Sequence, residues 1–244
     1  MINVRKYNLY LWLGFACPIV VLVNAMAKVL PAGARKAIAR GMAKWWASGM
    51  IWTAGATCSV EGLTHIEGEG PYIVMSNHRS HMDTPLLIRH IPFLFGFIVK
   101  KELMKIPVFA TAMKSIGCVA VSRGKSRSDY SGLDSVAADV AGGKNILVFP
   151  EGTRAPGDEF LPFKKGGVIV AIKAGVPILP VAVSGTGRVI PARKLRVNAG
   201  SLLLKVGAPI ETKGLEMDDR DELITRVQAA IEALYVPGYG GPGV

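Results

Sequence analysis

Acidic residues are missing from the beginning of this 244-residue sequence: residues 1–60 contain seven Lys or Arg and no Asp or Glu. Charged residues are scarce throughout at 19%, whereas 50% of all residues are hydrophobic. This composition excludes a disordered chain or a coiled coil and is apolar for a freely soluble protein. Cysteine is also scarce, and the three cysteines include no C-x-x-C pair. We therefore expect no disulfide framework, no cysteine zinc site and a reducing compartment.

Several motifs of well-known catalytic and phosphate-binding sites are also absent. The sequence has no G-x-S-x-G for a serine nucleophile and no G-x-G-x-x-G between a strand and a helix. Gly124-Lys125-Ser126 is similar to the end of a phosphate-binding loop, but Val119 stands where that motif requires glycine. With no protein nucleophile in evidence, the attacking group of any transfer reaction must come from a substrate or from water.

The positive charge is concentrated near the N-terminus. The net charge is +11 at pH 7, and the seven basic residues among residues 1–60 supply most of it. The same region contains all four tryptophans. Tryptophan favours the membrane interface and basic side chains favour acidic lipid head groups, so this region indicates an anionic membrane surface rather than nucleic acid.

Residues 1–56 are predicted to form a membrane-docking pair of helices that dips into one leaflet. The apolar stretch 9–27 has 19 residues, just enough for about 30 Å of hydrocarbon, but Pro18 and Asn24 interrupt it. In the second helix, basic side chains recur at every fourth position and form one stripe, which is typical of a helix in the membrane interface. A helical pair packed on the core and a single membrane span are the alternatives. The stripe consists of Lys36, Arg40 and Lys44.

From residue 57 the pattern changes to short β-rich runs that alternate with helical stretches. This alternation predicts an α/β domain over residues 57–236, with a mostly parallel central sheet flanked by helices. Residues 237–244 are rich in glycine and proline and are predicted to be a flexible tail. We expect strands at residues 57–62, 72–76, 95–99, 118–122, 145–149, 178–183 and 202–206. We expect helices at residues 84–91, 102–115, 129–141, 166–174 and 217–234.

The segment 76–85 follows an expected strand and contains His78, His81 and Asp83. His78 and Asp83 are five positions apart, so they can meet only if His78 precedes a helix and Asp83 lies near its start. Asp83 would then hold one nitrogen of an imidazole suited to proton transfer at neutral pH. His81 is expected to lie on the surface or line the pocket. We expect no metal site, because no further ligand cluster accompanies these side chains.

The segment Phe149-Pro150-Glu151-Gly152-Thr153-Arg154 directly follows another expected strand. A tight turn at this point would display a carboxylate, backbone N–H donors and a guanidinium together. Arginine is well suited to bidentate binding of phosphate. Taken by itself, however, the segment is more simply interpreted as a strand-to-loop turn with a surface ion pair.

Two more segments complete the pattern. Residues 117–123 form an expected strand that ends in Arg123, and a basic cluster that includes Lys105 precedes it. Residues 176–186 form an apolar run with two prolines. We interpret this run as a buried strand with kinked ends and assign no chemistry to it.

In this order and at these separations, the four segments resemble the glycerolipid acyltransferases, specifically the 1-acyl-glycerol-3-phosphate (lysophosphatidate) acyltransferases. The resemblance covers roughly residues 57–210 and implies that His78 and Asp83 are the catalytic pair. Ala120 stands where the family usually has an aromatic or larger apolar residue, which leaves the acyl preference open. The resemblance also implies a set of residues that bind the phosphate and glycerol of the substrate. These are Lys105, Arg123, Glu151, Gly152, Thr153 and Arg154.

The resemblance further implies the reaction. A fatty acyl group would pass from acyl-CoA or acyl carrier protein to the sn-2 hydroxyl of lysophosphatidic acid, giving phosphatidic acid for phospholipid biosynthesis. His78 would take the hydroxyl proton, and no cofactor or metal would be needed because the thioester is already activated. The expected partners are membrane lipids, lysophosphatidic acid and the acyl thioester, at the cytoplasmic face of the cell membrane. The sequence leaves the oligomeric state open.

Other interpretations remain at this point. The acceptor could be a lyso-ornithine lipid, another lysophospholipid or glycerol-3-phosphate, since related enzymes can share the same arginines. A non-catalytic membrane lipid-binding protein is a further alternative. Nucleic acid is not an expected partner, because residues 61–244 have a charge balance of only +4 and contain no basic stripe.

Overall fold

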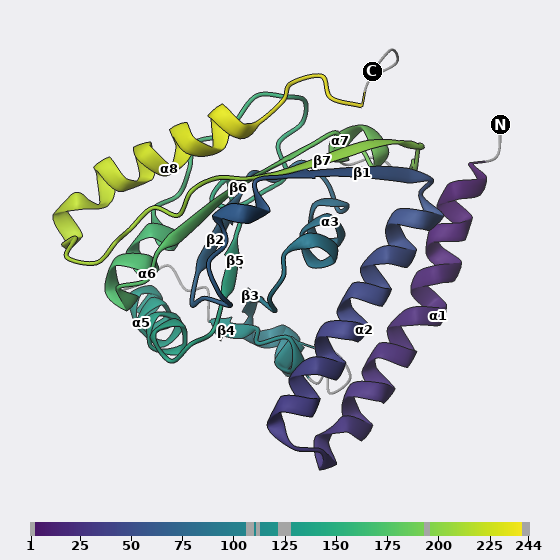
Figure 1. Cartoon of the computed structure of the whole chain (residues 1–244), viewed down its shortest axis with the longest axis horizontal. Helices are drawn as coiled ribbons and strands as arrows, with labels where there is room; N and C mark the ends of the chain where they lie inside the picture. The colour runs from purple at the N-terminus through teal and green to yellow at the C-terminus, as the bar shows by residue number, and fades with distance from the viewer. Residues whose placement is uncertain (1–2, 106–109, 111–112, 122–127, 193–195, 241–244) are drawn as a thin grey trace.

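A seven-stranded sheet lies at the centre of the part of the chain that the structure describes (Figure 1). The computed structural model describes residues 3–105, 110, 113–121, 128–192 and 196–240. The strand order is β1-β7-β6-β2-β5-β3-β4, and every neighbouring pair is parallel except β6 and β7. The predicted α/β fold with a mostly parallel sheet is therefore confirmed. The strands are β1 (Ala56–Glu61), β2 (Ile73–Ser76), β3 (Gly96–Lys100), β4 (Val119–Val121), β5 (Ile146–Val148), β6 (Ile178–Ser184) and β7 (Gly200–Val206).

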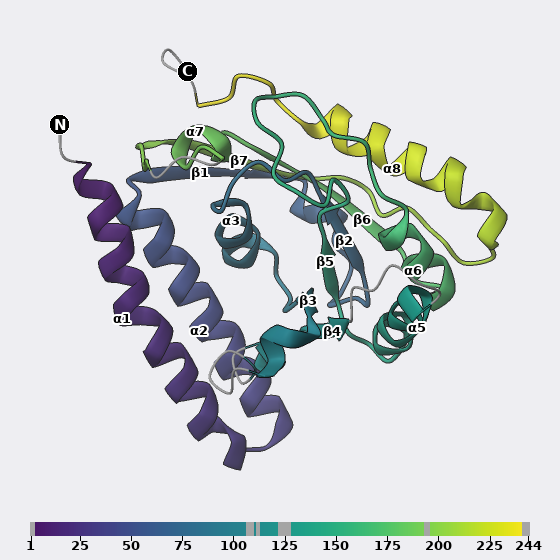
Figure 2. The same ribbon diagram turned by 180° about the vertical axis from the view of Figure 1, so that it is seen from behind.

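Two apolar cores cover the two faces of the sheet, because successive side chains of a strand point to opposite sides. In β2, Val74 belongs to the core that also contains side chains of α1, α2 and α3. Ile73 and Met75 belong to the opposite core, with side chains of α5, α6 and α8. Figures 1 and 2 show this arrangement from both sides. The helices are α1 (Val4–Met26), α2 (Ala32–Thr53), α3 (Asp83–His90), α5 (Ser128–Ala141), α6 (Gly166–Ala174), α7 (Thr186–Val189) and α8 (Arg220–Leu234).

Two helical segments differ from expectation. Of the helix expected at residues 102–115, Lys101–Lys105 forms a 3₁₀ helix, and the described residues 110 and 113–115 are α-helical. The four-residue helix α7 lies beyond the apolar run and has no counterpart in the expected elements. Further 3₁₀ helices are Ala27–Val29, Leu63–His65 and Met217–Asp219.

The first two helices form an antiparallel pair beside the sheet, with α1 on the outside (Figures 1 and 2). The Trp12 ring joins them. It packs against the Trp45 ring with centroids 4.8 Å apart, and its Nε1–H donates to the Trp46 carbonyl at 3.1 Å. Gly49 of α2 leaves the space that this ring occupies, since a Cβ at position 49 would overlap the Trp12 ring.

The outer face of this helix pair is apolar and exposed. Leu11 is 72% exposed and Trp52 is 79% exposed. The segment Val4–Val29 is long and apolar enough to cross a membrane, by length and composition, and only 17% of its apolar window is buried. Further exposed apolar side chains on the pair are those of Val4, Tyr7, Tyr10, Phe15, Leu22, Met26 and Trp45.

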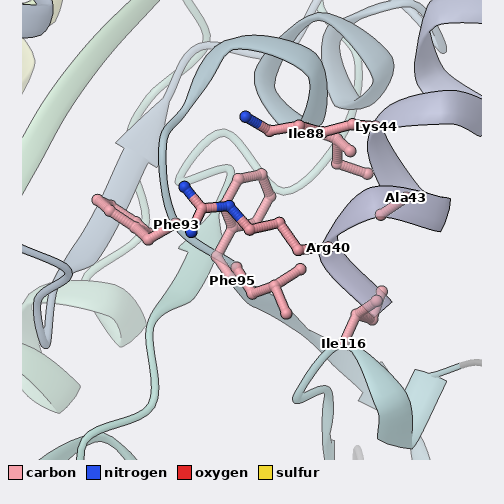
Figure 3. Close-up of a pocket in the computed structure, with 8 residues that line it drawn as sticks. Arg40, Ala43, Lys44, Ile88, Phe93, Phe95 and Ile116 are labelled. Atoms are coloured by element: carbon pink, nitrogen blue, oxygen red, sulfur yellow. The ribbon is translucent and has the colours of Figure 1, made fainter. Parts of the chain in front are cut away.

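The basic stripe of α2 faces the α/β domain, not the exposed outer face. Lys36 and Arg40 form ion pairs with Glu69, at 2.8 Å and 3.0 Å, in the loop before β2. Figure 3 shows Arg40 and Lys44 extending from α2 into a hollow that is also lined by Phe93. Contact of this stripe with lipid head groups stays a prediction, and two of its three residues pair with the domain instead of being free. Glu69, about thirty residues away in sequence, pairs with two of the three stripe residues, and helical spacing alone cannot reveal that contact.

Replacing Gly49 by alanine is expected to lower the free energy of unfolding by about 1–3 kcal/mol, the usual cost of overpacking a filled contact. Alanine normally stabilises a helix interior by up to about 1 kcal/mol relative to glycine, so the clash with Trp12 must outweigh this preference. Gly41→Ala in the same helix is the matched control, because a Cβ there meets nothing within 4 Å. Thermal or urea unfolding in detergent measures both variants. Stabilisation of the protein by both substitutions would contradict the packing of Trp12 against Gly49.

Candidate active site

His78 and Asp83 meet across the turn between β2 and α3. His78 lies on the turn and Asp83 is the first residue of α3, as their spacing requires. His78 Nδ1 is 2.7 Å from Asp83 Oδ2. The same carboxylate oxygen accepts the backbone N–H groups of Arg79, at 2.7 Å, and Ser80, at 2.8 Å. The Asp83 side chain is fully buried, so these donors hold a carboxylate that is shielded from water.

This contact determines which ring nitrogen of His78 is available for chemistry. A carboxylate is an acceptor, so Nδ1 carries the proton that is donated to Asp83, and Nε2 is left as a proton acceptor. The His78 side chain is 20% exposed and lines an open cavity. The geometry therefore supports a histidine that takes a proton through Nε2.

Buried side chains tie the histidine turn to the sheet. The Asn77 side-chain amide donates to the Val183 carbonyl at 2.9 Å, and its oxygen accepts the Val183 N–H at 2.8 Å. Ser80 Oγ donates to the Ile190 carbonyl at 2.7 Å. Because both side chains are fully buried, these bonds are protected from competition with water, and they hold the turn against β6 and the segment after it.

The turn after β5 holds His78 from two further directions. The Phe149 ring stacks on the imidazole, with ring centroids 4.0 Å apart and planes inclined by 13°. Glu151 accepts the backbone N–H of His78 at 2.8 Å. The turn thus contacts both the ring and the backbone of the histidine.

Glu151 points into the protein. It forms an ion pair with Arg79 at 3.0 Å, and both side chains are almost completely buried. The oxygen in this ion pair, Oε2, also accepts the Leu161 N–H at 3.0 Å, whereas Oε1 accepts the His78 N–H. Both carboxylate oxygens of Glu151 are therefore engaged by protein donors. The substrate-binding role that the resemblance implies for Glu151 stays a prediction.

The remaining predicted site residues do not all lie beside His78. Gly152 has a φ of +70°, which glycine adopts readily, and its N–H donates to the Phe149 carbonyl at 3.0 Å. Thr153 is exposed on this turn. Arg154 lines the His78 cavity, whereas Lys105 lines a different cavity. Arg123 lies outside the described residues.

The His78 cavity has a volume of about 700 Å³ and is lined by basic side chains as well as by an apolar wall. Lys6 of α1 and Arg196 line it together with Arg154. Sequence reasoning missed Lys6 and Arg196, because neither stands in a motif and only the folded chain places them near residue 78. The apolar wall includes Leu9, Leu13, Trp46 and Met50 of the helix pair and Ile190 and Val197 of the domain.

A second, apolar cavity of about 530 Å³ adjoins the first. The two cavities share Trp46 and Thr84 as lining residues. Val20 and Val21 of α1, Ala43 of α2 and Phe97 of β3 are among the other residues around it. An apolar cavity therefore lies next to the His78 cavity, between the helix pair and the domain.

His81 also lines the His78 cavity and differs from His78 in its environment. Burial lowers the pKa of His81, and the nearby positive charge of Arg154 lowers that pKa further. A lowered pKa keeps a histidine neutral at neutral pH, so His81 adds no positive charge to the cavity. Among the described residues, no group of three or more His, Cys, Asp or Glu side chains is arranged to hold a metal ion.

Comparison with known proteins identifies the family. Residues 57–184 match the Acyltransferase family. A chloroplastic 1-acyl-sn-glycerol-3-phosphate acyltransferase from Brassica napus, BAT2, is 33% identical over 69% of this chain and 49% of its own length. The human 1-acyl-sn-glycerol-3-phosphate acyltransferase alpha is 30% identical over 74% of this chain and 64% of its own length. The chain thus spans about half to two thirds of these curated relatives.

A solved structure is similar over almost the whole chain. The crystal structure of the 1-acyl-sn-glycerophosphate (LPA) acyltransferase PlsC from Thermotoga maritima matches with a TM-score of 0.80 and 28% sequence identity. The match covers 96% of this chain and 95% of that one, so it includes the helix pair as well as the sheet. The chain therefore belongs to the acyltransferase family, as its motifs predict. Within that family, the relatives named here are all acyltransferases of 1-acyl-sn-glycerol-3-phosphate.

Replacing Glu151 by glutamine is expected to lower the free energy of unfolding by about 3–5 kcal/mol, because it leaves the buried Arg79 guanidinium without its counter-charge. The matched control is Glu61→Gln, which breaks an ion pair with Lys205 in which the Glu61 side chain is 59% exposed. That control is expected to cost less than about 1 kcal/mol. Urea unfolding in detergent measures both. Equal, small losses would show that Glu151 does not carry a buried charge pair.

Proposed function

We propose that this protein transfers a fatty acyl group from an acyl thioester to the sn-2 hydroxyl of lysophosphatidic acid, giving phosphatidic acid. The single observation that carries the proposal is the His78–Asp83 hydrogen bond beside a cavity that is lined by basic side chains and an apolar wall. A phosphate-bearing lipid has the matching chemistry, an anionic head and a hydrocarbon chain. The names of the similar proteins support the same acceptor.

The proposed reaction begins with proton removal. His78 Nε2 takes the proton of the sn-2 hydroxyl, and the hydroxyl oxygen attacks the thioester carbonyl. The tetrahedral intermediate then collapses, the carbon–sulfur bond breaks, and the protonated His78 returns its proton to the departing thiolate. Asp83 stabilises the imidazolium between these steps, and the Phe149 stack holds the plane of the ring. Acyl-CoA and acyl carrier protein both supply a suitable thioester.

The two cavities suggest one place for the phosphate of the acceptor lipid and another for an acyl chain. Arg154 is a proposed ligand of the acceptor phosphate, since a guanidinium binds phosphate in a bidentate manner and this one lines the His78 cavity. Arg123 and Lys105 remain proposed phosphate ligands on the resemblance alone. The adjoining apolar cavity is the proposed site of an acyl chain, because its walls are apolar and it borders the His78 cavity at Trp46 and Thr84.

We further propose that the helix pair lies in one leaflet at the cytoplasmic face of the cell membrane. The pair presents a row of exposed apolar and aromatic side chains on its outer face, including Leu11 and Trp52. A surface of this kind is buried in the interfacial region of a bilayer. Because the inner side of the same helices forms a wall of the His78 cavity, an acceptor lipid could keep its chain in the leaflet while its head reaches His78.

Purified protein is expected to release thiol from acyl-CoA or acyl carrier protein in the presence of lysophosphatidic acid. His78→Ala is expected to lower the turnover about 10²–10⁴-fold, the usual contribution of a general base. His65→Ala is the control, because His65 is exposed and does not line the cavity. A panel of lyso-ornithine lipid, other lysophospholipids and glycerol-3-phosphate tests the choice of acceptor. Wild-type turnover in the His78→Ala variant would overturn the mechanism.

Leu11→Glu and Trp52→Glu are each expected to weaken sedimentation with anionic phospholipid vesicles by about 10-fold or more, because burial of one large apolar side chain contributes about 1.5–3 kcal/mol. Met217→Glu is the control, since Met217 is an exposed apolar residue outside the helix pair. If all three substitutions weaken vesicle binding equally, the outer face of the helix pair is not the membrane-binding surface.

A further inference from the structure

Lys6 lies on α1, yet it faces the same cavity as His78. It is one of three basic side chains that line this cavity, and the others are Arg154 on the turn after β5 and Arg196 before β7. These three residues come from segments that are far apart in the sequence. Their convergence is therefore a property of the folded chain and cannot follow from a local motif.

Asn3 fixes the start of α1 to the segment that carries Arg196. Its side-chain amide donates to the Val197 carbonyl at 2.9 Å. Its side-chain oxygen accepts the backbone N–H of Lys6 at 3.0 Å and caps the helix. One residue thus connects the backbones of Lys6 and Val197. This connection holds the first turn of α1 against the rim of the cavity and sets the position from which Lys6 extends.

The three basic side chains that line the cavity have no internal counter-charge. Among the described residues, none of Lys6, Arg154 and Arg196 forms an ion pair, and no carboxylate lines the cavity. His81 contributes no charge, because burial lowers its pKa. Three like charges beside one cavity repel one another, and an anion bound between them removes that repulsion. The anion that fits best is a phosphate monoester, which carries close to two negative charges at neutral pH.

We propose that Lys6 binds the phosphate monoester of the acceptor lipid, together with Arg154 and Arg196. The N-terminal helix is then a wall of the substrate site as well as a membrane attachment, and it selects acceptors by head group. This inference rests on the proposed acyl transfer to lysophosphatidic acid. It goes beyond it by assigning recognition of the phosphate to a residue of α1, outside the region that matches the family motifs.

Binding of the phosphate by Lys6 would make the protein selective for acceptors with a phosphate monoester. A phosphate monoester has more negative charge than a phosphodiester head group, so it gains more from three neighbouring cations. A neutral monoacylglycerol gains nothing from them. Loss of Lys6 should therefore weaken the use of lysophosphatidic acid strongly and the use of monoacylglycerol not at all.

The test compares two neighbouring residues of α1. Lys6→Gln and Arg5→Gln remove the same charge from the same helical turn, so they change the attraction to an anionic membrane equally. Arg5 is exposed and does not line the cavity. Steady-state kinetics are measured in mixed micelles of fixed composition, with lysophosphatidic acid and monoacylglycerol as acceptors.

Lys6→Gln is expected to raise the KM for lysophosphatidic acid about 10-fold or more, as for loss of a hydrogen bond between charged groups. The kcat at saturation should stay within about 2-fold of wild type, since Lys6 contacts the head group and not the reacting atoms. Arg5→Gln should leave the KM unchanged, and Lys6→Arg should restore most of the loss, because arginine retains the charge.

Three outcomes separate the possibilities. An unchanged KM in Lys6→Gln, or the same rise in Lys6→Gln and Arg5→Gln, overturns the role of Lys6 while the wild-type protein still acylates lysophosphatidic acid. An equal loss with monoacylglycerol also overturns it, because a neutral acceptor has no phosphate. If the wild-type protein does not acylate lysophosphatidic acid at all, the proposed function fails instead. Circular dichroism of each variant confirms that the helices are intact.

Discussion

The hydrogen bond between His78 and Asp83 is the interaction on which the rest of the site depends. It requires a histidine on the turn before a helix and an aspartate at the first position of that helix. The parallel sheet meets this requirement, because β2 ends in the middle of the sheet and its chain turns directly into α3. Asn77 then ties the turn to β6. The geometry of one side-chain contact is thus built into the centre of the fold.

Burial of charge makes this arrangement both costly and rigid. Asp83, Glu151 and Arg79 are almost inaccessible to water, and desolvation of each charge costs several kcal/mol. Three donors on Asp83 Oδ2 and the Arg79 pair with Glu151 offset that cost. Any displacement of the turn breaks several of these contacts together. The histidine is therefore held in position before substrate arrives, which is what proton transfer at a defined atom requires.

Local patterns in the sequence were sufficient for the strands, whereas the histidine–aspartate pair was predicted with the help of the family resemblance. Each expected strand is present within a few residues, since a buried strand such as β6 is a short apolar run bounded by turns. Contacts between distant segments were not predictable. The pairing of Glu69 with Lys36 and Arg40 of the basic stripe in α2 was not foreseen. Likewise, Glu151 turns inward to Arg79, and Lys6 reaches the His78 cavity.

The most direct test of the account is the protonation of the His78 ring, observed by ¹⁵N NMR of histidine-labelled protein in detergent micelles. The His78 signals are assigned by their loss in the His78→Ala variant. The account predicts a neutral ring that carries its proton on Nδ1, with Nε2 free, and loss of this preference in Asp83→Asn. A wild-type ring with its proton on Nε2, or a ring that Asp83→Asn leaves unchanged, would contradict the claim that Asp83 prepares His78 to act as a base.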